Sequence, residues 1–427
     1  MKAAVIGSGP GGYLAALLLA AAGVEVDLFE KNEIGGVCLN RGCVPTKHLL
    51  AFGKAYQKGL SYGFKIHGAS FEAAVSFAVK GASFFRESIT TLLKKSGINV
   101  IKAEAKVYPG RKVEVNGTSS VYDAVIVAVG SRPAVPEPFS GLPVITGEDF
   151  VEFRHAQRVA VVGAGAQGIE IASFYRLLGA EVHLIEMLPQ LLPVLPGRVA
   201  ALYEGRLKKN GIQIHKGKRV VKADYSNSLF RLIFEDGEEL TDIEQLIIAA
   251  GRKPATETIL IPEIKDERGF LIVDSYFETS EKGVYAVGDC IKTPALAYTA
   301  YAEAEACVAN ILGSKKVLDY AHLPYAVFGW PEIAWVGRLE GNEIRVQAGV
   351  SARAMAENEQ DGFVILYEGK EGLNGGVIIG LEAAEIIHLV ESMLVGQKVE
   401  DYYFIHPTFT EVLGEAIIKL SGRKRHG

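Results

Sequence analysis

The stretch Val5-Ile6-Gly7-Ser8-Gly9-Pro10-Gly11-Gly12 decides the fold, because the sequence contains it twice. It returns 156 residues later as Val161-Val162-Gly163-Ala164-Gly165-Ala166-Gln167-Gly168. The register then continues without a gap, so that Glu30 of the first copy matches Glu186 of the second. Each copy has the pattern of an apolar strand, a glycine turn, an apolar helix of about 12 residues and a second strand. The repeat therefore predicts one βαβ unit that is used twice.

Both copies have the context of a dinucleotide-binding turn. Each follows a strand, opens a helix and reaches an acidic residue 23 positions after its first glycine. The first glycine permits the tight bend, the second lets the backbone approach a pyrophosphate, and the third allows close helix packing. Free N–H groups at the helix start attract the phosphate, and the carboxylate accepts from a ribose. The expected binding residues are Gly7, Gly9, Gly12 and Glu30, and in the second copy Gly163, Gly165, Gly168 and Glu186.

A second pair of similar segments indicates how the rest of the chain is divided into domains. The segments 125–133 and 246–254 both read as buried strands that end at a turn, the second of them at Gly251. A similar strand at 284–289 predicts that the chain returns to the first nucleotide domain after it completes the second. From about His322 the dinucleotide pattern stops, and alternating segments precede helices such as Ala383 to Leu394. We therefore expect an α/β protein with domains at 1–139 plus 262–320, at 140–261, and an α+β domain at 321–427.

Composition excludes several classes of protein. A length of 427 residues predicts two to four domains, and 49% hydrophobic with 22% charged residues is ordinary for a globular chain. A net charge of −5 disfavours nucleic-acid binding, so the closing Arg423-Lys424-Arg425-His426 is expected to be a solvated tail. Four cysteines are too few for a secreted disulfide scaffold, which favours a cytoplasmic protein. The unbroken apolar run Tyr13 to Ala22 is too short to cross a bilayer.

The stretch from Gly35 to Lys47 pairs two cysteines, Cys38 and Cys43, as CxxxxC. We expect no metal here, because zinc needs about four ligands and no second cysteine or histidine pair is in range. Two buried structural thiols are one alternative. A disulfide is another, although five helical steps separate Cα atoms by about 7.5 Å in rise, whereas disulfides usually need less than about 6.8 Å. A disulfide would require an irregular helix, for which Gly42 and Pro45 supply the means.

Taken together, these motifs resemble those of the pyridine nucleotide-disulfide oxidoreductases, and most closely of the members that oxidise dihydrolipoamide. The resemblance extends to His406-Pro407-Thr408-Phe409-Thr410-Glu411 near the end of the chain. It implies two Rossmann-like domains, the first binding FAD and the second NAD, and a C-terminal dimerisation domain. It also implies oxidation of dihydrolipoamide through a redox-active disulfide and FAD, with NAD⁺ reduced to NADH. A homodimer serving a 2-oxoacid dehydrogenase or glycine cleavage complex is the implied assembly.

The resemblance also implies roles for individual side chains. Cys43 resembles the sulfur that faces the flavin, and Cys38 the sulfur that exchanges with substrate. His406 resembles the acid–base catalyst, which Glu411 orients and which acts across the dimer interface. Glu411 also fits a TxxE capping box with Thr408, a structural explanation that is compatible with orientation.

The remaining implied contacts concern the cofactors. Lys47 would lie close to the isoalloxazine and pair with Glu170. The alternative for Glu170 is a helix-start glutamate that the helix dipole favours. The flavin side would also include Asp289 and Ala297.

The chain departs from the family pattern in three places. Phe328-Gly329-Trp330-Pro331-Glu332 stands where a threonine near the flavin is expected, and Ala166 and Gln167 replace larger apolar residues. The chain is also a few tens of residues shorter than expected. These departures bear on nicotinamide gating and substrate access.

Two other functions remain open. One is a glutathione reductase-like enzyme, which Glu186 disfavours because a carboxylate repels the 2′-phosphate of NADP. The second open function is a nucleotide-binding redox sensor without efficient turnover. Mercuric and large thioredoxin reductases are disfavoured, because they need a C-terminal cysteine pair, which this chain lacks. The remaining histidines are expected to be surface or helix residues, among them His48, His155 and His388.

Overall fold

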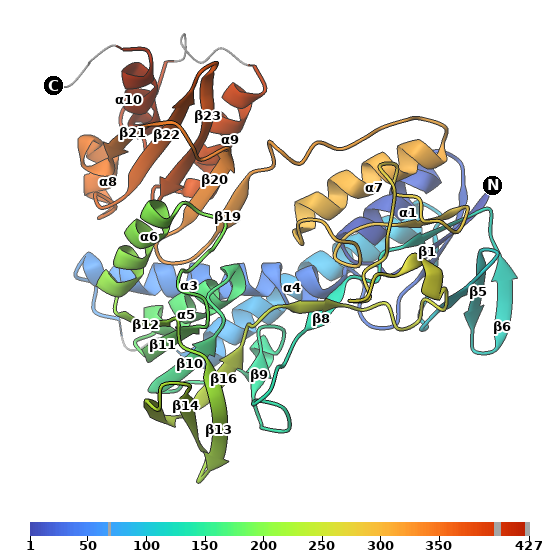
Figure 1. Cartoon of the computed structure of the whole chain (residues 1–427), viewed down its shortest axis with the longest axis horizontal. Helices are drawn as coiled ribbons and strands as arrows, with labels where there is room; N and C mark the ends of the chain where they lie inside the picture. The colour runs from blue at the N-terminus through green and yellow to red at the C-terminus, as the bar shows by residue number, and fades with distance from the viewer. Residues whose placement is uncertain (67–69, 397–402, 423–427) are drawn as a thin grey trace.

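The protein is described from a computed structural model that covers residues 1–66, 70–396 and 403–422. The chain forms two parallel-sheet units and one antiparallel unit, and the antiparallel unit lies above the second parallel sheet (Figure 1). The segment 423–427, which includes the expected solvated tail, lies outside the described residues.

The first parallel sheet is completed by a strand from far along the chain. Its strand order is β18-β7-β1-β2-β3, and every pair is parallel. Strand β1 is apolar and buried from Ala3 to Ile6, as expected for a strand covered on both faces, and Val5 is fully buried. Helices α1 and α7 pack against one another beside this sheet (Figure 1). The bounds are β1 Lys2–Ile6, β2 Glu25–Phe29, β3 Asn99–Ile101, β7 Ala124–Val127, β18 Val284–Ala286, α1 Pro10–Ala21, α4 Phe71–Lys95 and α7 Ala297–Ile311.

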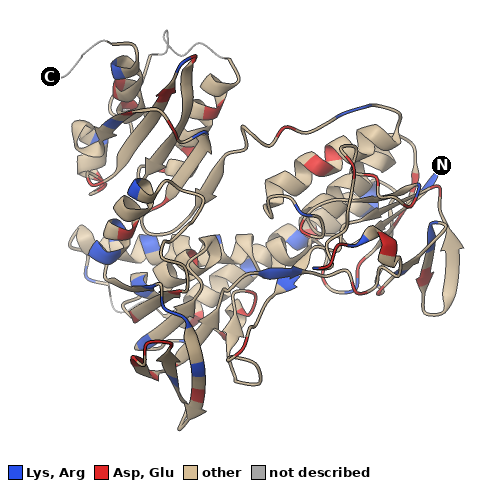
Figure 2. Ribbon diagram, viewed as in Figure 1, with Lys and Arg blue, Asp and Glu red and all other residues tan. Residues whose placement is uncertain are grey.

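The second parallel sheet repeats this plan in the order β12-β11-β10-β16-β9. A three-stranded antiparallel sheet, β13-β14-β15, packs its apolar side chains against one face, where Phe230 and Leu232 meet Ile185. Its outer strand β13 carries one basic and one acidic residue, Lys222 and Asp224, which form an ion pair at 3.0 Å (Figure 2). The bounds are β9 Ile145–Thr146, β10 Arg158–Val162, β11 Glu181–Glu186, β12 Ile212–Lys216, β16 Gln245–Ile248, β13 Val220–Ser226, β14 Leu229–Phe234, β15 Glu239–Ile243, α5 Ala166–Leu177 and α6 Gly197–Lys209.

Two buried or half-buried histidines face each other on this second sheet. His183 of β11 is 2% exposed, and its Nδ1 lies 3.0 Å from Nε2 of His215 on β12. Burial lowers the pKa of His183, and the nearby His215 and Arg158 lower it further. The pair is therefore neutral in the folded protein near pH 7.

Short elements connect the two parallel units. The crossing strands β8 and β17 pair antiparallel, which places Ser131 opposite Pro254. A second small sheet, β4-β5-β6, extends from the first unit (Figure 1). The bounds are β4 Lys106–Tyr108, β5 Lys112–Val115, β6 Thr118–Val121, β8 Ser131–Pro133, β17 Arg252–Pro254, α2 Gly36–Asn40, α3 Cys43–Ser61, and the 3₁₀ helices η1 Phe150–Glu152 and η2 Pro262–Ile264.

The C-terminal unit is an antiparallel sheet with helices against it. Its strand order is β19-β20-β23-β22-β21, and the expected helix at 383–394 is present as α9. The bounds are β19 Tyr325–Val327, β20 Ile333–Gly337, β21 Asn342–Gln347, β22 Phe363–Gly369, β23 Gly372–Ile379, α8 Ala352–Ala356, α9 Ala383–Leu394, α10 Thr410–Leu420 and the 3₁₀ helix η3 Ala348–Val350. The predicted fold class, α/β with two Rossmann-type units and an α+β unit, is confirmed. The domain boundaries remain a prediction.

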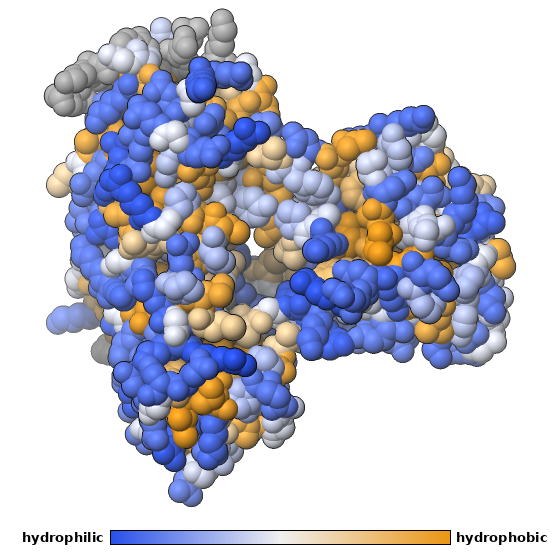
Figure 3. Space-filling view, viewed as in Figure 1, coloured by the Kyte–Doolittle hydropathy of each residue, from blue (hydrophilic) through white to orange (hydrophobic). Residues whose placement is uncertain are grey.

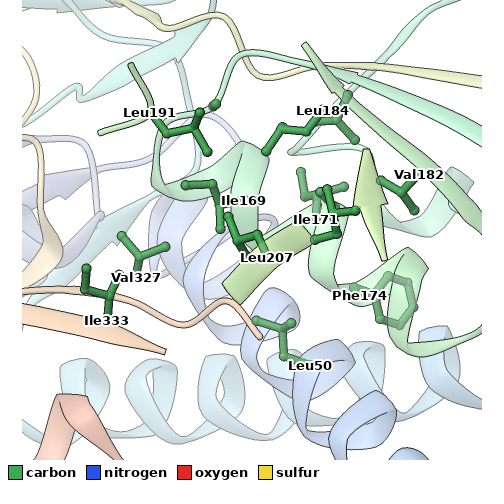
Figure 4. Close-up of a cluster of buried hydrophobic side chains, with 14 of the residues drawn as sticks. Leu50, Ile169, Ile171, Phe174, Val182, Leu184, Leu191, Leu207, Val327 and Ile333 are labelled. Carbon is green, nitrogen blue, oxygen red and sulfur yellow. The ribbon is translucent and has the colours of Figure 1, made fainter. Parts of the chain in front are cut away.

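One hydrophobic core joins helix α3, the second parallel sheet and the C-terminal sheet. Leu50 of α3 and Ile169 of α5 pack with Val327 of β19 in the same buried cluster (Figure 4). The helix that begins at Cys43 is thus fixed against both the second sheet and the C-terminal sheet. Such interior packing resists displacement, so the cysteine segment rests on a rigid support.

Candidate functional site

The first glycine turn has the shape of a nucleotide cradle. Gly7 has a φ of +97°, and a Cβ added to Gly12 would lie 1.9 Å from the carbonyl oxygen of Gly7. An added Cβ on Gly9 would meet nothing within 4 Å, so the backbone there is open to a ligand. The residues therefore fit a bound dinucleotide pyrophosphate. The second turn has the same geometry at Gly163, Gly168 and Gly165.

The two acidic residues sit beside their turns in the same way. Glu30 Oε2 accepts hydrogen bonds from the backbone N of Ser8 at 2.9 Å and from its Oγ at 2.7 Å. Glu186 Oε2 accepts from the backbone N of Ala164 at 2.8 Å. Each carboxylate thus lies at the end of its second strand, next to the helix N-terminus, as ribose binding requires.

A cavity of about 1070 Å³ joins the first turn to the cysteines. Ala166 and Gln167 at the start of α5 also line it, so the cavity reaches the second nucleotide unit. On one face of the molecule a hollow is visible beside the N-terminal end of α7 (Figure 3). Of the predicted site residues, those lining the cavity are Gly7, Gly9, Glu30, Cys38, Cys43, Lys47, Glu170, Asp289 and Ala297.

The cysteine segment is an interrupted helix. Helix α2 ends at Asn40 and α3 begins at Cys43, with Gly42 at φ −122° and ψ −109° between them. The expected irregularity is therefore present. Pro45 lies in the first turn of α3, where its missing N–H costs no hydrogen bond. The break brings the thiols of Cys38 and Cys43 into hydrogen-bond contact as free cysteines.

The two thiols have opposite acidities. The hydrogen bond from Cys38 is the largest influence on Cys43 and, with the charge of Lys47, lowers the pKa of Cys43 to about 7, against the opposing effect of burial. The same hydrogen bond and burial raise the pKa of Cys38. In the reduced protein Cys43 is accordingly the more acidic thiol, about half of it ionised at pH 7, and Cys38 keeps its proton.

The predicted contact between Lys47 and Glu170 is present. Lys47 Nζ lies 2.8 and 2.7 Å from the two carboxylate oxygens of Glu170. The backbone N of Phe328 donates to Glu170 at 3.0 Å, and the Phe328 ring centroid lies 4.5 Å from Lys47 Nζ. The segment that departs from the family pattern thus supports this ion pair. An added Cβ on Gly329 would lie 2.6 Å from the Tyr203 hydroxyl, which leaves no room there for a threonine.

A hydrogen-bonded network that the sequence did not predict surrounds Asp289. Ser131 Oγ donates to Asp289 at 2.6 Å, and Arg252 Nε donates to Ser131 Oγ at 2.6 Å. Arg252 also donates to Glu148 at 2.6 Å. The similarity between segments 131–133 and 252–254 was the available sequence signal. These two segments form β8 and β17, which pair with one another and bring Ser131 and Arg252 together.

His406 and Glu411 form a pair outside the cavity of this chain. Nδ1 of His406 lies 2.8 Å from Glu411 Oε1, and the His406 side chain is 72% exposed. Glu411 Oε2 accepts from the backbone N of Thr408 at 2.8 Å. Of the two hydrogen bonds of the expected capping box, the one from the Thr408 backbone N to the Glu411 side chain is present. The Thr408 hydroxyl instead donates to the carbonyl of Ile405, and α10 begins two residues later, at Thr410.

A second histidine–carboxylate pair does line the cavity, and the sequence reasoning missed it. His388 is a helix residue, as expected, but its Nδ1 lies 2.8 Å from Glu391 Oε2 and both side chains face the cavity. The only sequence signal was the i, i+3 spacing, which many surface helices share.

Within residues 1–66, 70–396 and 403–422, no helix is long and apolar enough to cross a membrane. The same residues form no cluster of three side chains suited to a metal ion.

Known proteins resemble this chain along almost its whole length. A dihydrolipoyl dehydrogenase of Haloarcula marismortui is 32% identical and covers 96% of this chain and 94% of its own. One from Thermus scotoductus is 32% identical over 99% of this chain and 98% of its own. The solved structure of LpdA from Mycobacterium tuberculosis superimposes with a TM-score of 0.89 at 22% identity, covering 98% of this chain and 99% of its own.

A second solved structure superimposes with the same TM-score. The HOCl-induced flavoprotein disulfide reductase RclA of Escherichia coli, as its Cu(II) complex, has a TM-score of 0.89 at 23% identity and covers 99% of both chains. The family model for pyridine nucleotide-disulphide oxidoreductases matches residues 1–304. The cradle at Gly7, its repeat at Gly163 and the paired thiols agree with that match. The chain belongs to the pyridine nucleotide-disulphide oxidoreductase family, whose cofactors are FAD and NAD.

Proposed function

We propose that this protein is a dihydrolipoamide dehydrogenase, which oxidises dihydrolipoamide to lipoamide and reduces NAD⁺ to NADH. The observation that carries the proposal is the position of the two contacting thiols, Cys38 and Cys43. They lie in a cavity that begins at one nucleotide turn and reaches the helix that opens at the other. Full-length relatives named dihydrolipoyl dehydrogenase support this substrate.

In this proposal the two cradles hold different nucleotides. The first holds FAD on Gly7, Gly9, Gly12 and Glu30, with Asp289 and Ala297 on the flavin side. The second holds NAD on Gly163, Gly165, Gly168 and Glu186, with Gly251 in the turn between strands β16 and β17. Bound FAD supplies the capacity to pass an electron pair from the thiols to NAD⁺.

The difference in pKa between Cys43 and Cys38 assigns each sulfur a role in the exchange with substrate. A substrate thiolate attacks the sulfur of Cys38, the Cys38–Cys43 bond breaks, and Cys43 leaves as a thiolate beside Lys47. The second substrate thiol then displaces Cys38, which closes the substrate disulfide and leaves Cys38 as a thiol. Lys47 keeps its position through Glu170 and stabilises the negative charge on Cys43. His406, oriented by Glu411, accepts the proton of the attacking thiol.

Two observations support a homodimer with composite active sites. His406 is exposed and does not line the cavity of its own chain. The neighbouring Tyr403 and Ile405 are 99% and 77% exposed, so large apolar side chains adjoin His406 on this surface. We therefore assign His406 to the cavity of the partner subunit, and the dimer to the cytoplasm as a component of a 2-oxoacid dehydrogenase or glycine cleavage complex.

Subunit mixing tests the composite site. Cys38→Ser and His406→Ala homodimers should each lack lipoamide turnover. A mixed dimer contains one site with both lesions and one with neither, so mixing should restore up to about half of the activity per heterodimer. No recovery after verified subunit exchange contradicts the composite site.

Substrate choice is tested by steady-state turnover of the FAD-loaded protein with lipoamide and with oxidised glutathione. The proposal expects a clear preference for lipoamide with NADH as donor. A preference for glutathione indicates the glutathione reductase-like alternative. Flavin reduction without turnover of either disulfide indicates a redox sensor.

A further inference from the structure

The side chain of Gln167 is a feature of the cavity that the proposed mechanism does not use. Gln167 is the second residue of α5, and Gly165 is the N-cap of that helix. Gln167 and Glu170 both line the cavity, and a spacing of three residues places them on one face of the helix. Glu170 in turn holds Lys47, whose charge acts on the thiols. The Gln167 amide therefore lies between the second glycine turn and this ion pair.

Gly147 makes room for the amide of Gln167. A Cβ added to Gly147 would lie 2.4 Å from both Cδ and Nε2 of Gln167 and 2.8 Å from its Oε1. The whole amide group thus lies against the backbone of Gly147. The loop is braced, because Asp149 Oδ2 accepts from the backbone N of Thr146 at 2.8 Å and from its Oγ1 at 2.7 Å. The absence of a side chain at Gly147 consequently gives the amide a fixed seat.

The amide also has unused capacity for hydrogen bonds. A primary amide offers two donor hydrogens and an acceptor oxygen, and the half-buried Gln167 uses none of them with the described residues of the chain. Other polar groups at this end of the cavity are already engaged. Lys47 binds Glu170, and Arg252 Nε donates to Ser131 Oγ at 2.6 Å. Gln167 thus presents both a donor and an acceptor to a ligand.

The position of Gln167 matches the path of a bound dinucleotide. The start of α5 attracts the pyrophosphate, and a Cβ added to Gly165 would meet nothing within 4 Å. In the proposed reaction the nicotinamide end must reach the side of the cavity where Lys47 and the thiols lie. A dinucleotide held at Gly165 therefore passes Gln167, and the neighbouring Ala166 carries only a methyl group that would stand beside it.

The chemistry of the nicotinamide ring fits an amide. The ring carries a carboxamide, and two primary amides form a reciprocal pair of hydrogen bonds in which each donates to the oxygen of the other. The ring is a cation in NAD⁺ and neutral in NADH, so a carboxylate at position 167 would favour the oxidised form. A neutral amide binds both forms. The large apolar residue expected at this position could not form these hydrogen bonds.

We propose that Gln167 binds the carboxamide of the nicotinamide ring and determines the specificity of the chain for that group. The inference rests on the proposed NAD cradle at Gly163, Gly165 and Gly168, but not on lipoamide as the substrate. Nε2 of Gln167 donates to the carboxamide oxygen, and Oε1 accepts from the carboxamide nitrogen. Gln167 takes no part in the transfer of electrons.

The test is equilibrium binding of nucleotides to the oxidised, FAD-loaded full-length protein, measured by titration calorimetry. Oxidised protein and oxidised nucleotides exchange no electrons, so binding is measured apart from turnover. The probes are NAD⁺, its acetylpyridine analogue, in which a methyl group replaces the amide NH₂, and ADP-ribose, which lacks the ring. The wild type should bind NAD⁺ about tenfold more tightly than the analogue, because the analogue loses one hydrogen bond.

Variants of Gln167 separate the carboxamide contact from the rest of the site. In Gln167→Leu the ratio of the two Kd values should fall to about one, while the Kd of ADP-ribose stays at the wild-type value. Gln167→Glu keeps an acceptor oxygen for the amide NH₂ and should keep the ratio. The matched control is Gln213→Leu. Gln213 donates to Glu181 at 2.9 Å, does not line the cavity, and its variant should bind all three probes as the wild type does.

The outcomes distinguish this inference from the proposed function. A wild type that does not discriminate NAD⁺ from the analogue, or an unchanged ratio in Gln167→Leu, overturns the inference. An equal loss of affinity for ADP-ribose in Gln167→Leu also overturns it, because the amide then contacts the phosphates or a ribose. A wild type that binds none of the probes contradicts the NAD cradle and this inference with it. A wild type that binds NAD⁺ but does not turn over lipoamide contradicts only the proposed substrate.

Discussion

Replacing Lys47 with methionine tests whether its ammonium group sets the acidity of Cys43. An opposite charge nearby lowers a pKa by about 1 to 3 units, and we take about one, because the Lys47 side chain is 34% exposed. The wild-type pKa of Cys43 is about 7, so half of this thiol is ionised at pH 7. In Lys47→Met the thiolate fraction at pH 7 should fall to roughly one tenth, a loss of about fivefold.

The assay is the alkylation rate of each cysteine in the reduced protein across a pH range of about 5 to 9, resolved by mass spectrometry. The matched control is Lys54→Met. Lys54 lies on the same helix, is 33% exposed and contacts Glu332 at 2.6 Å, but it does not line the cavity. Both variants should lose about 1 to 3 kcal/mol of unfolding free energy, less than a fully buried pair, so stability cannot mimic the result. An unchanged Cys43 midpoint in Lys47→Met refutes the reasoning.

Other substitutions probe the cradles and the buried histidines. Gly12→Ala should destabilise the fold, because its Cβ would lie 1.9 Å from the Gly7 carbonyl oxygen. Gly9→Ala should keep the wild-type Tm, because its Cβ meets no atom within 4 Å, and should lose at least about tenfold in FAD affinity. Equal flavin titrations for Gly9→Ala and the wild type contradict the second expectation. Glu186→Arg should move kcat/KM toward NADPH by about 10-fold or more, and an unchanged ratio counts against the ribose contact. Because the folded-state pKa of His183 is lowered, its stabilisation is fully present above about pH 6.5 and is lost as pH falls below that value; urea midpoints should decline there in the wild type and less so in His183→Gln.

The parallel units could be predicted because their signals are local. Helices α1 and α5 each have the 12 residues that the apolar spacing indicated, and the strand expected at 284–289 is β18. The antiparallel sheets β4-β5-β6 and β13-β14-β15 were not predicted. Strand β6 is exposed at every position, so it shows no apolar alternation. Where tertiary pairing rather than burial fixes a strand, periodicity gives little warning.

The two nucleotide cradles could be predicted from local glycine spacing, whereas the contacts between distant side chains could be predicted only from the family resemblance. Lys47 and Glu170 are separated by 123 residues, and no spacing rule brings them together; the contact was expected from the resemblance alone. His388 carries the signature of an exposed helix residue, which is accurate for its helix and exposure. What the sequence could not show is which face of α9 meets the cavity. That depends on how the C-terminal sheet packs against α3 and α5, a long-range arrangement.

The late strand β18 has a consequence for the order in which the chain folds. It pairs with β7, and Val284 lies opposite Val125, so the first sheet lacks its edge strand until residue 286 has left the ribosome. The second parallel sheet needs only residues 145–248 and is complete earlier. Domains generally fold as units during synthesis, so the second unit should form first. During that time strand β7 still lacks its partner β18, and the folded second unit anchors the chain on its C-terminal side. In arrested nascent chains, protease resistance should therefore appear in the middle of the sequence before it appears at the beginning.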